Sequence, residues 1–120
     1  MTRDEQDAIS ADFNKAVNMT PSALRTWLAT DESRSVGMAP DGEKITHSTQ
    51  SEAVGHHMGE RILEIRATRH TDLTEQDYRD MRKVVGYVHR HMAQRPKGKV
   101  VDTRWRRSLM NWGHDPLRDE

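Results

Sequence analysis

Residues 74–92, TEQDYRDMRKVVGYVHRHM, carry the clearest helical signal in the chain. The apolar side chains of this stretch recur at intervals of three and four residues, as one face of an α-helix requires. They are Tyr78, Met81, Val85, Val88 and Met92. Thr74 followed by Asp77 resembles a capping box with aspartate in the usual glutamate position. We therefore predict a helix over 75–94 that turns this apolar face to the core.

Four other segments show the same periodicity over fewer residues. They are 5–18, 21–29, 51–68 and about 103–112. Gly55 and Gly59 interrupt the third of these, and glycines four residues apart allow another helix to approach closely. The chain has no strand pattern and no repeat. The sequence predicts one all-α domain over residues 1–120, a compact bundle of about five helices.

Two stretches lack helical periodicity. Residues 30–51 are rich in Gly, Pro, Ser, Asp and Thr, and about 20 residues is long for a connection in a compact domain. We predict a long irregular segment here, either functional or mobile, in which 33–36 could add one helical turn. Residues 114–120 are predicted to form a C-terminal tail.

The composition limits the classes of protein that the chain can represent. Only 33% of the residues are hydrophobic, mean hydropathy is −0.97 and cysteine is absent. The lack of cysteine excludes disulfides, thiolate metal sites and a cysteine nucleophile. No apolar run approaches the roughly 18 residues of a membrane span, and the N-terminus does not resemble a signal peptide. We expect a cytoplasmic protein with no membrane partner.

The stretch RWRRSLMNWG, residues 104–113, places two of the three tryptophans beside three arginines. Trp105, Leu109 and Trp112 share one helix face by their spacing of four and three. Arg104, Arg107 and Asn111 share another face. A chain with so few aromatic residues needs its large rings in the core. We predict that the tryptophans are buried and that the polar face lies in water.

Charge is distributed unevenly along a chain whose formal net charge is zero. Residues 1–60 carry 5 basic and 10 acidic side chains, whereas residues 61–118 carry 14 basic and 7 acidic ones. Residues 82–107 contain nine basic side chains and only one acidic side chain, Asp102. Such a distribution can present a basic surface on a neutral molecule.

Arginine and lysine bind DNA chiefly through the phosphate backbone. Gly86, midway between Arg82 and Arg90 on one helix face, is expected to leave backbone open to a phosphate. We therefore predict DNA binding with little sequence specificity. The predicted phosphate contacts are Arg82, Lys83, Arg90, Arg95, Lys97, Lys99, Arg104, Arg106 and Arg107.

The main alternative is a protein–protein adaptor or a self-associating module, in which acidic and basic halves of two molecules pair. Catalytic signatures are absent: the sequence contains no HExxH motif, nucleophile elbow, Walker loop or dinucleotide fingerprint. Of the seven histidines, His56 and His57 are neighbours and His89 and His91 lie at i, i+2, spacings that do not suit one metal ion, and the other three are isolated. We expect no enzymatic activity, no catalytic or metal-binding residues and no cofactor.

Four stretches together resemble a known family. They are TPSALRTWLATDESRSVG (20–37), VGHHMGERILEI (54–65), LTEQDYRDMRKVVGYVHRHMAQRP (73–96) and DTRWRRSLMNWGHDPL (102–117). They resemble the family named domain of unknown function 3140 over about residues 12–117. The function of that family is not established, but its members are often labelled DNA-binding protein. The resemblance therefore implies DNA binding and supplies no catalytic residues.

Overall fold

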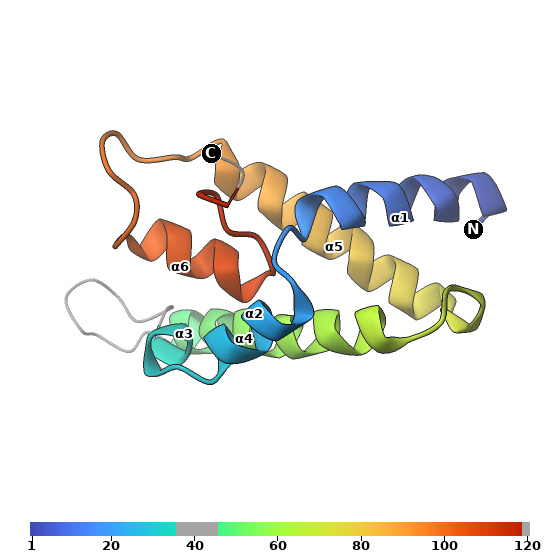
Figure 1. The fold of residues 1–120 in the computed structure, drawn as a ribbon, viewed down its shortest axis with the longest axis horizontal. Coiled ribbons are helices and arrows are strands. Elements are labelled where there is room, and N and C mark those ends of the chain that lie inside the picture. Colours follow the sequence, from blue (N-terminus) through green and yellow to red (C-terminus); the bar gives the residue numbers. More distant parts are fainter. Residues whose placement is uncertain (36–45, 119–120) are drawn as a thin grey trace.

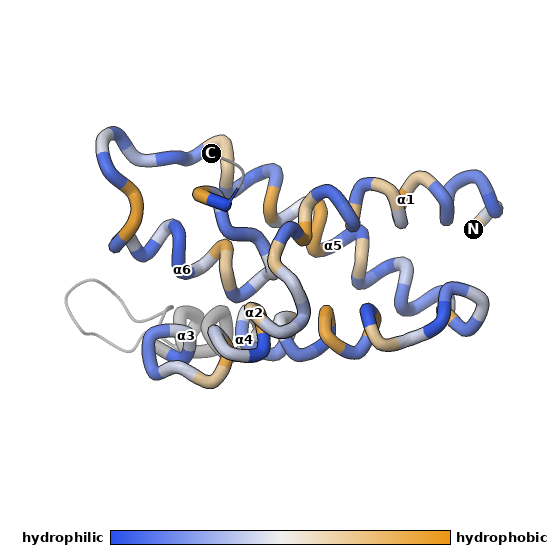
Figure 2. The backbone as a smooth tube through the Cα atoms, in the orientation of Figure 1, coloured by the Kyte–Doolittle hydropathy of each residue, from blue (hydrophilic) through white to orange (hydrophobic). Residues whose placement is uncertain are grey.

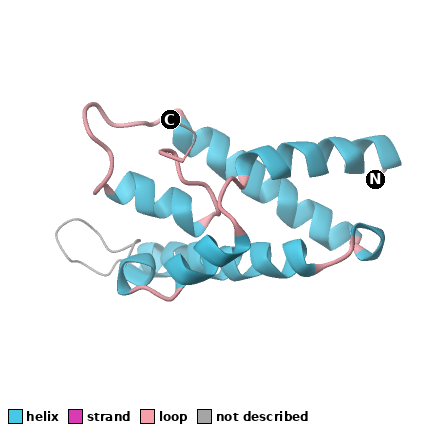
Figure 3. Cartoon of the chain, in the orientation of Figure 1, coloured by secondary structure: helices cyan, strands magenta, loops and turns pink. Residues whose placement is uncertain are grey.

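A computed structural model describes residues 1–35 and 46–118, and within them the chain is helical with no strand. A short 3₁₀ helix, η1 (His70–Asp72), joins the fourth helix to the fifth. The α-helices are α1 (Arg3–Ala16), α2 (Pro21–Leu28), α3 (Asp31–Ser35), α4 (Thr46–Ala67), α5 (Glu75–Met92) and α6 (Arg104–Asn111). Figures 1 and 3 show this arrangement. The all-α prediction is confirmed, with one more helix than expected.

Two groups of helices surround one core. α1 lies along α5, while α2, α3 and α6 pack around α4. Five helices each contribute at least one apolar side chain that is at most 2% exposed. These are Phe13, Leu24, Ile62, Val84, Val88 and Leu109. Figure 2 shows the surrounding tube as largely hydrophilic, so the small apolar fraction is concentrated where the helices meet.

The last helix is held by its tryptophans, as predicted. Trp105 and Trp112 are each 8% exposed. Tyr87 stacks on Trp112 with ring centroids 4.2 Å apart, and His91 stacks on Tyr87 at 5.1 Å. The Trp105 indole donates a 2.7 Å hydrogen bond to the His91 carbonyl. These contacts fix α6 against α5.

The glycines of α4 allow the close approach that their spacing suggests. A Cβ on Gly59 would lie 2.6 Å from Leu28 Cδ2 and 2.7 Å from the Asn111 carbonyl oxygen. Real Cβ atoms do not approach other atoms so closely, so this position excludes a side chain. At Gly55 the nearest atom, Trp112 Nε1, would lie 3.4 Å away. Gly59 is therefore the point where α4 meets both α2 and α6.

Asn111 is the polar residue whose position the sequence predicts wrongly. It is 2% exposed instead of sharing a solvated face with Arg104 and Arg107. Its Oδ1 accepts hydrogen bonds from Trp27 Nε1 at 2.8 Å and from the Ser33 hydroxyl, and its Nδ2 donates to the Ser33 carbonyl at 3.0 Å. A buried amide is tolerated when its partners are present. Helical spacing alone does not reveal these partners, because they lie on α2 and α3.

The segment predicted to be irregular over 30–51 is helical at both ends. Asp31–Ser35 forms α3, where the Thr30 hydroxyl accepts a 3.1 Å hydrogen bond from the Ser33 N–H. Two acidic residues in the first turn, Asp31 and Glu32, interact favourably with the positive end of the helix dipole. α4 begins at Thr46, five residues before the predicted start. Residues 36–45, and 119–120 of the predicted tail, lie outside the described residues.

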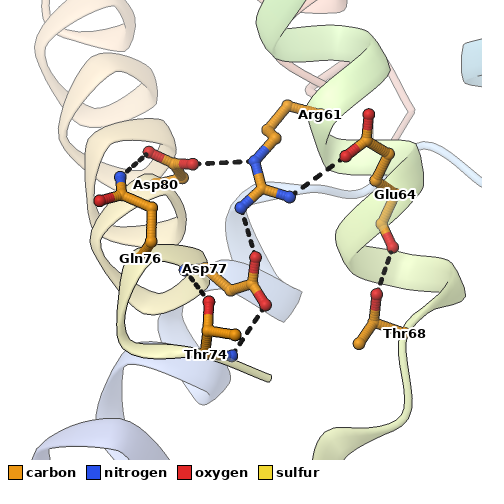
Figure 4. A network of polar contacts seen from close by, with 7 residues as sticks. All are labelled: Arg61, Glu64, Thr68, Thr74, Gln76, Asp77 and Asp80. Carbon is orange, nitrogen blue, oxygen red and sulfur yellow. Dashed lines mark hydrogen bonds and ion pairs between the residues drawn. The ribbon is translucent and has the colours of Figure 1, made fainter. Parts of the chain in front are cut away.

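An arginine on α4 joins this helix to the start of α5 (Figure 4). Arg61 Nε donates to Asp80 at 2.8 Å, Nη2 donates to Asp77, and Nη1 lies 3.3 Å from Glu64. Asp77 also completes the capping box with Thr74. Hydrogen bonding from the Thr74 N–H, opposed by burial and assisted by Arg61, lowers the pKa of Asp77. The network places charge-assisted bonds between two helices.

The segment after α6 packs against the connection between α1 and α2. Asn18 and Asp115 exchange two hydrogen bonds, 2.9 and 2.8 Å long. His114 Nδ1 lies 2.7 Å from the Ala16 carbonyl, and the Met19 N–H donates to the Gly113 carbonyl at 3.1 Å. Gly113 has a φ of +79°, a backbone conformation that favours glycine. Residues 113–115 thus hold the C-terminal part of the chain against residues 16–19, at the end of α1.

Candidate nucleic-acid interface

The nine predicted phosphate contacts fall into two classes of exposure. Three of them, Arg104, Arg106 and Arg107, are half-buried, and the others are exposed. Exposure alone does not bring the cations together, since they come from α5, from α6 and from the connection between them. Their immediate neighbours decide which of them share a surface.

The connection 93–103 lies at one end of the molecule (Figure 1), and several of its residues line a depression. Arg95 and Lys99 line it together with Val101 and Leu117, and its volume is about 420 Å³. Gly98, at a φ of +85°, supplies the turn between them. The Arg95 guanidinium lies 5.7 Å from the centroid of the Trp105 ring. Val101 is 48% exposed, an apolar contact surface that the charge pattern does not reveal.

Arg104 and Arg107 extend this basic surface onto the first turns of α6. Thr103 begins the helix by accepting a 3.2 Å hydrogen bond from the Arg106 N–H. Residues three apart are neighbours on a helix surface, so Arg104 and Arg107 form one pair. We call the set Arg90, Arg95, Lys97, Lys99, Arg104 and Arg107 the basic end.

Arg106 does not belong to that set because its donors are used inside the protein. Its Nε and Nη2 each bind an Asp115 carboxylate oxygen at 3.0 Å, and Nη1 donates to the Val101 carbonyl at 2.9 Å. The bond to Asp115 raises the pKa of Arg106. Burial alone would raise the pKa of Asp115, but the bonds from Arg106 and the Leu117 N–H lower it overall. Arg106 holds the C-terminal segment.

The remaining cations of α5 lie in a different electrostatic environment. Arg82 lines a depression of about 240 Å³ with Glu5 and Asp12 of α1. Lys83 is exposed on the same helix. Arg82 lies eight residues, roughly 12 Å of helix, before Arg90. Arg82 therefore lies beside acidic residues of α1 and is not part of the basic end.

The backbone at Gly86 is not open as the sequence suggests. A Cβ placed there would lie 3.0 Å from Arg90 Nη1. The Arg90 guanidinium folds back along α5 over the glycine, and its charge acts on the neighbouring Tyr87 hydroxyl. Burial nevertheless raises the pKa of Tyr87. A phosphate at this point would meet the Arg90 side chain instead of bare backbone.

The acidic first helix leaves the basic end uncovered. α1 packs on α5 and, among the described helices, makes no contact with α6. Its N-terminus lies at the end of the molecule opposite the 93–103 connection (Figure 1). α5 has 18 residues and spans roughly 27 Å, several times the ~8 Å screening length at physiological salt. The acidic N-terminus of α1 is therefore screened from the basic end, whereas α3, which carries Asp31 and Glu32, packs against α6.

Three histidines take part in separate local contacts. His56 lies 3.3 Å from Glu60, His91 is stacked, and His114 contacts the Ala16 carbonyl. Among the side chains that the structure describes, in 1–34 and 55–118, no group of three or more potential ligands is arranged to hold a metal ion. Among the described helices, none has the length and apolar character needed to cross a membrane.

Comparison with known families gives a match. The family model described as "Protein of unknown function (DUF3140)" matches residues 12–110. No curated protein and no solved structure matches the chain.

Proposed function

The chain belongs to the DUF3140 family, whose function is unknown, and we propose from its surface that it binds DNA through phosphates at the basic end. The observation that carries the proposal is the separation of charge: the basic end is distant from the acidic N-terminus of α1. Between residues 90 and 107 only Asp102 is acidic. A local excess of positive charge attracts a polyanion although the whole molecule is neutral.

The proposed mechanism is neutralisation of phosphates with release of counterions. Six cations at the basic end would give a slope of roughly −5 in log affinity against log salt for duplex DNA. Contacts to phosphates position a protein on DNA and carry no sequence information directly. The proposed binding is therefore non-enzymatic, has little sequence preference, and takes place in the cytoplasm as the sequence suggests.

The test is the affinity for a random-sequence DNA duplex, measured by fluorescence anisotropy at about 50 and 200 mM salt. Wild-type affinity should fall on the order of 10³-fold between the two. Lys97→Ala combined with Lys99→Ala should weaken binding and reduce the salt slope by about 2, one for each lost phosphate contact. Both lysines are exposed on the connection, so the fold should be retained.

The matched control removes two exposed cations away from the basic end, Arg25→Ala with Arg69→Ala. It changes the net charge equally and should leave the salt slope near the wild-type value. Absence of binding at the lower salt, or an equal loss of slope in the control, would contradict the proposal.

A second candidate function is self-association, favoured by the same polarity. Exposed acidic side chains, including Asp4 and Asp7, lie at the end of α1 opposite the basic end, so two molecules could pair head to tail. Light scattering at low and high salt distinguishes the candidates. A dimer that dissociates in salt, together with no DNA binding, would support the adaptor class.

A further inference from the structure

A small pocket lies where α1, the end of α4 and the start of α5 meet, far in sequence from the basic end. Its volume is about 160 Å³. One water needs only roughly 10–15 Å³ measured in this way, and drug-sized ligands occupy about 300–1,000 Å³. The space therefore suits a molecule of a few heavy atoms.

The ionisable groups that line the pocket are both basic in type. They are Arg66 and His70, and no aspartate or glutamate joins them in the lining. Arg66 takes part in no ion pair among the described residues, unlike Arg61 five residues earlier, which binds two aspartates. Burial, and no neighbouring charge, lowers the pKa of Arg66. A guanidinium remains charged at neutral pH nevertheless.

Arg66 is held in place by contacts that leave part of its hydrogen-bonding capacity unused. Its Nη2 donates a 2.8 Å hydrogen bond to the Val17 carbonyl at the end of α1. Its guanidinium lies 5.6 Å from the centroid of the Phe13 ring. The Nε–H is buried and has no hydrogen-bond partner in the described structure. Leaving a buried charged donor unpaired is more unfavourable than leaving a neutral donor unpaired.

A second unpartnered polar atom lies on the opposite helix. The Ser10 hydroxyl on α1 is buried without a hydrogen-bond partner and lines the same pocket as Arg66. Buried hydroxyls normally find a partner. Both residues line the pocket, although their unpartnered atoms, Arg66 Nε and the Ser10 hydroxyl oxygen, are themselves covered by protein atoms. The apolar side chains of Phe13, Ile65 and Met81 complete its walls.

We propose that this pocket binds a small organic carboxylate. The ligand's carboxylate pairs with the Arg66 guanidinium, and small rotations of the two side chains let Arg66 Nε and the Ser10 hydroxyl donate the hydrogen bonds that each lacks. A short hydrocarbon body lies against Phe13, Ile65 and Met81. The site is independent of DNA binding, because it involves none of the residues of the basic end.

The test uses sodium butyrate and its neutral analogue butyramide, added at constant ionic strength to ¹⁵N-labelled protein and followed by NMR. Butyrate should cause saturable shifts of amides in 10–14 and 65–70, with a dissociation constant on the order of 1 mM, well within the limit for so small a ligand. Butyramide has the same body without the charge and should cause none.

Three variants separate the roles of charge and space. Arg66→Gln should weaken butyrate binding by about tenfold or more, as expected for loss of a charged hydrogen bond. Arg69→Gln removes an exposed charge nearby and should change affinity less than about twofold, in line with the small effect of exposed charges. Ser10→Leu should block binding by filling the pocket while Arg66 keeps its contact with Val17.

The outcomes decide the proposal in either direction. Binding of butyramide as strong as that of butyrate, or unchanged binding in Ser10→Leu, would overturn it. Should Arg66→Gln fail to fold because α1 loses its contact, Ser10→Leu gives the decisive comparison.

Discussion

Gly59 shows most directly how one residue constrains this fold. Its missing side chain lets α4 touch Leu28 of α2 and the backbone of Asn111 at once. We predict that Gly59→Ala lowers the free energy of unfolding by about 2–3 kcal/mol, because overpacking outweighs the gain in helix propensity of about 1 kcal/mol. Chemical denaturation measures the change.

Gly86→Ala is the matched control on α5. Its new Cβ would meet only the end of the flexible Arg90 side chain, which can move aside. This variant should be as stable as the wild type or more stable by up to about 1 kcal/mol. Equal destabilisation of the two variants would show that the contact at Gly59 is not what matters.

Single residues were predictable from the sequence where a local rule decides them. The spacing of Gly55 and Gly59 indicates a close approach, and the aromatic count places Trp105 and Trp112 in the core. The buried contacts of Asn111 and Arg66 could not be predicted by local rules, because their partners are distant in sequence. An arginine one position after a buried isoleucine looks like any solvated side chain until α1 is placed beside it.

At the scale of elements, Arg61 decides how α4 and α5 meet. We predict that Arg61→Met lowers the free energy of unfolding by about 2 kcal/mol at neutral pH, because Asp77 and Asp80 lose their partner. Thermal and urea unfolding report the loss. The control is Arg79→Met, an exposed arginine 3.8 Å from Glu75, which should change stability by less than about 0.5 kcal/mol.

The effect of Arg61→Met should depend on pH in a defined sense. The pKa of Asp77 is lowered in the folded state from its ordinary 3.8. Its contribution is therefore fully present above about pH 4 and is lost as the pH falls through the lowered folded value. The stability gap between wild type and variant should narrow below pH 4. A constant gap down to pH 2 would contradict this account of the network.

The helices that the sequence predicts best are those whose apolar residues recur most regularly. The helix from Glu75 has both an apolar stripe and a capping box, and its start was predicted to the residue. α3 has five residues, too few for a periodic pattern, and depends on burial of Ser33. The early start of α4 was missed because Thr, Ser and Gln over 46–51 carry no apolar stripe.

At the scale of the whole molecule, Asp115 connects the segment after α6 to residues distant in sequence. Its backbone bonds to Asn18 and its carboxylate bonds to Arg106. We predict that Asp115→Ala lowers the free energy of unfolding by about 1–3 kcal/mol, since the half-buried Arg106 and the Leu117 N–H lose their carboxylate partner. Hydrogen exchange should quicken at the amides of residues 115–118, which this carboxylate ties to Arg106. The exposed Asp102, which also acts on Arg106, provides the control, and Asp102→Ala should change stability by less than about 0.5 kcal/mol. Unchanged exchange in Asp115→Ala would contradict this role of the carboxylate.

The basic end was foreseeable from the charge of residues 82–107, but its membership was not. Charge counting treats Arg106 like Arg107, although three-dimensional contacts direct Arg106 to Asp115. It also includes Arg82, which packs beside acidic residues of α1. Sequence indicates which charges exist, and tertiary packing selects those that face water together.

The docking of residues 113–115 on 16–19 has a consequence for synthesis. During synthesis α1 is made before α5, its main packing partner. Residues at the end of α1 and just after it bond to residues made almost a hundred codons later. The nascent chain therefore carries an unpartnered amphipathic helix until α5 has been made, and that helix is where a chaperone would encounter this protein.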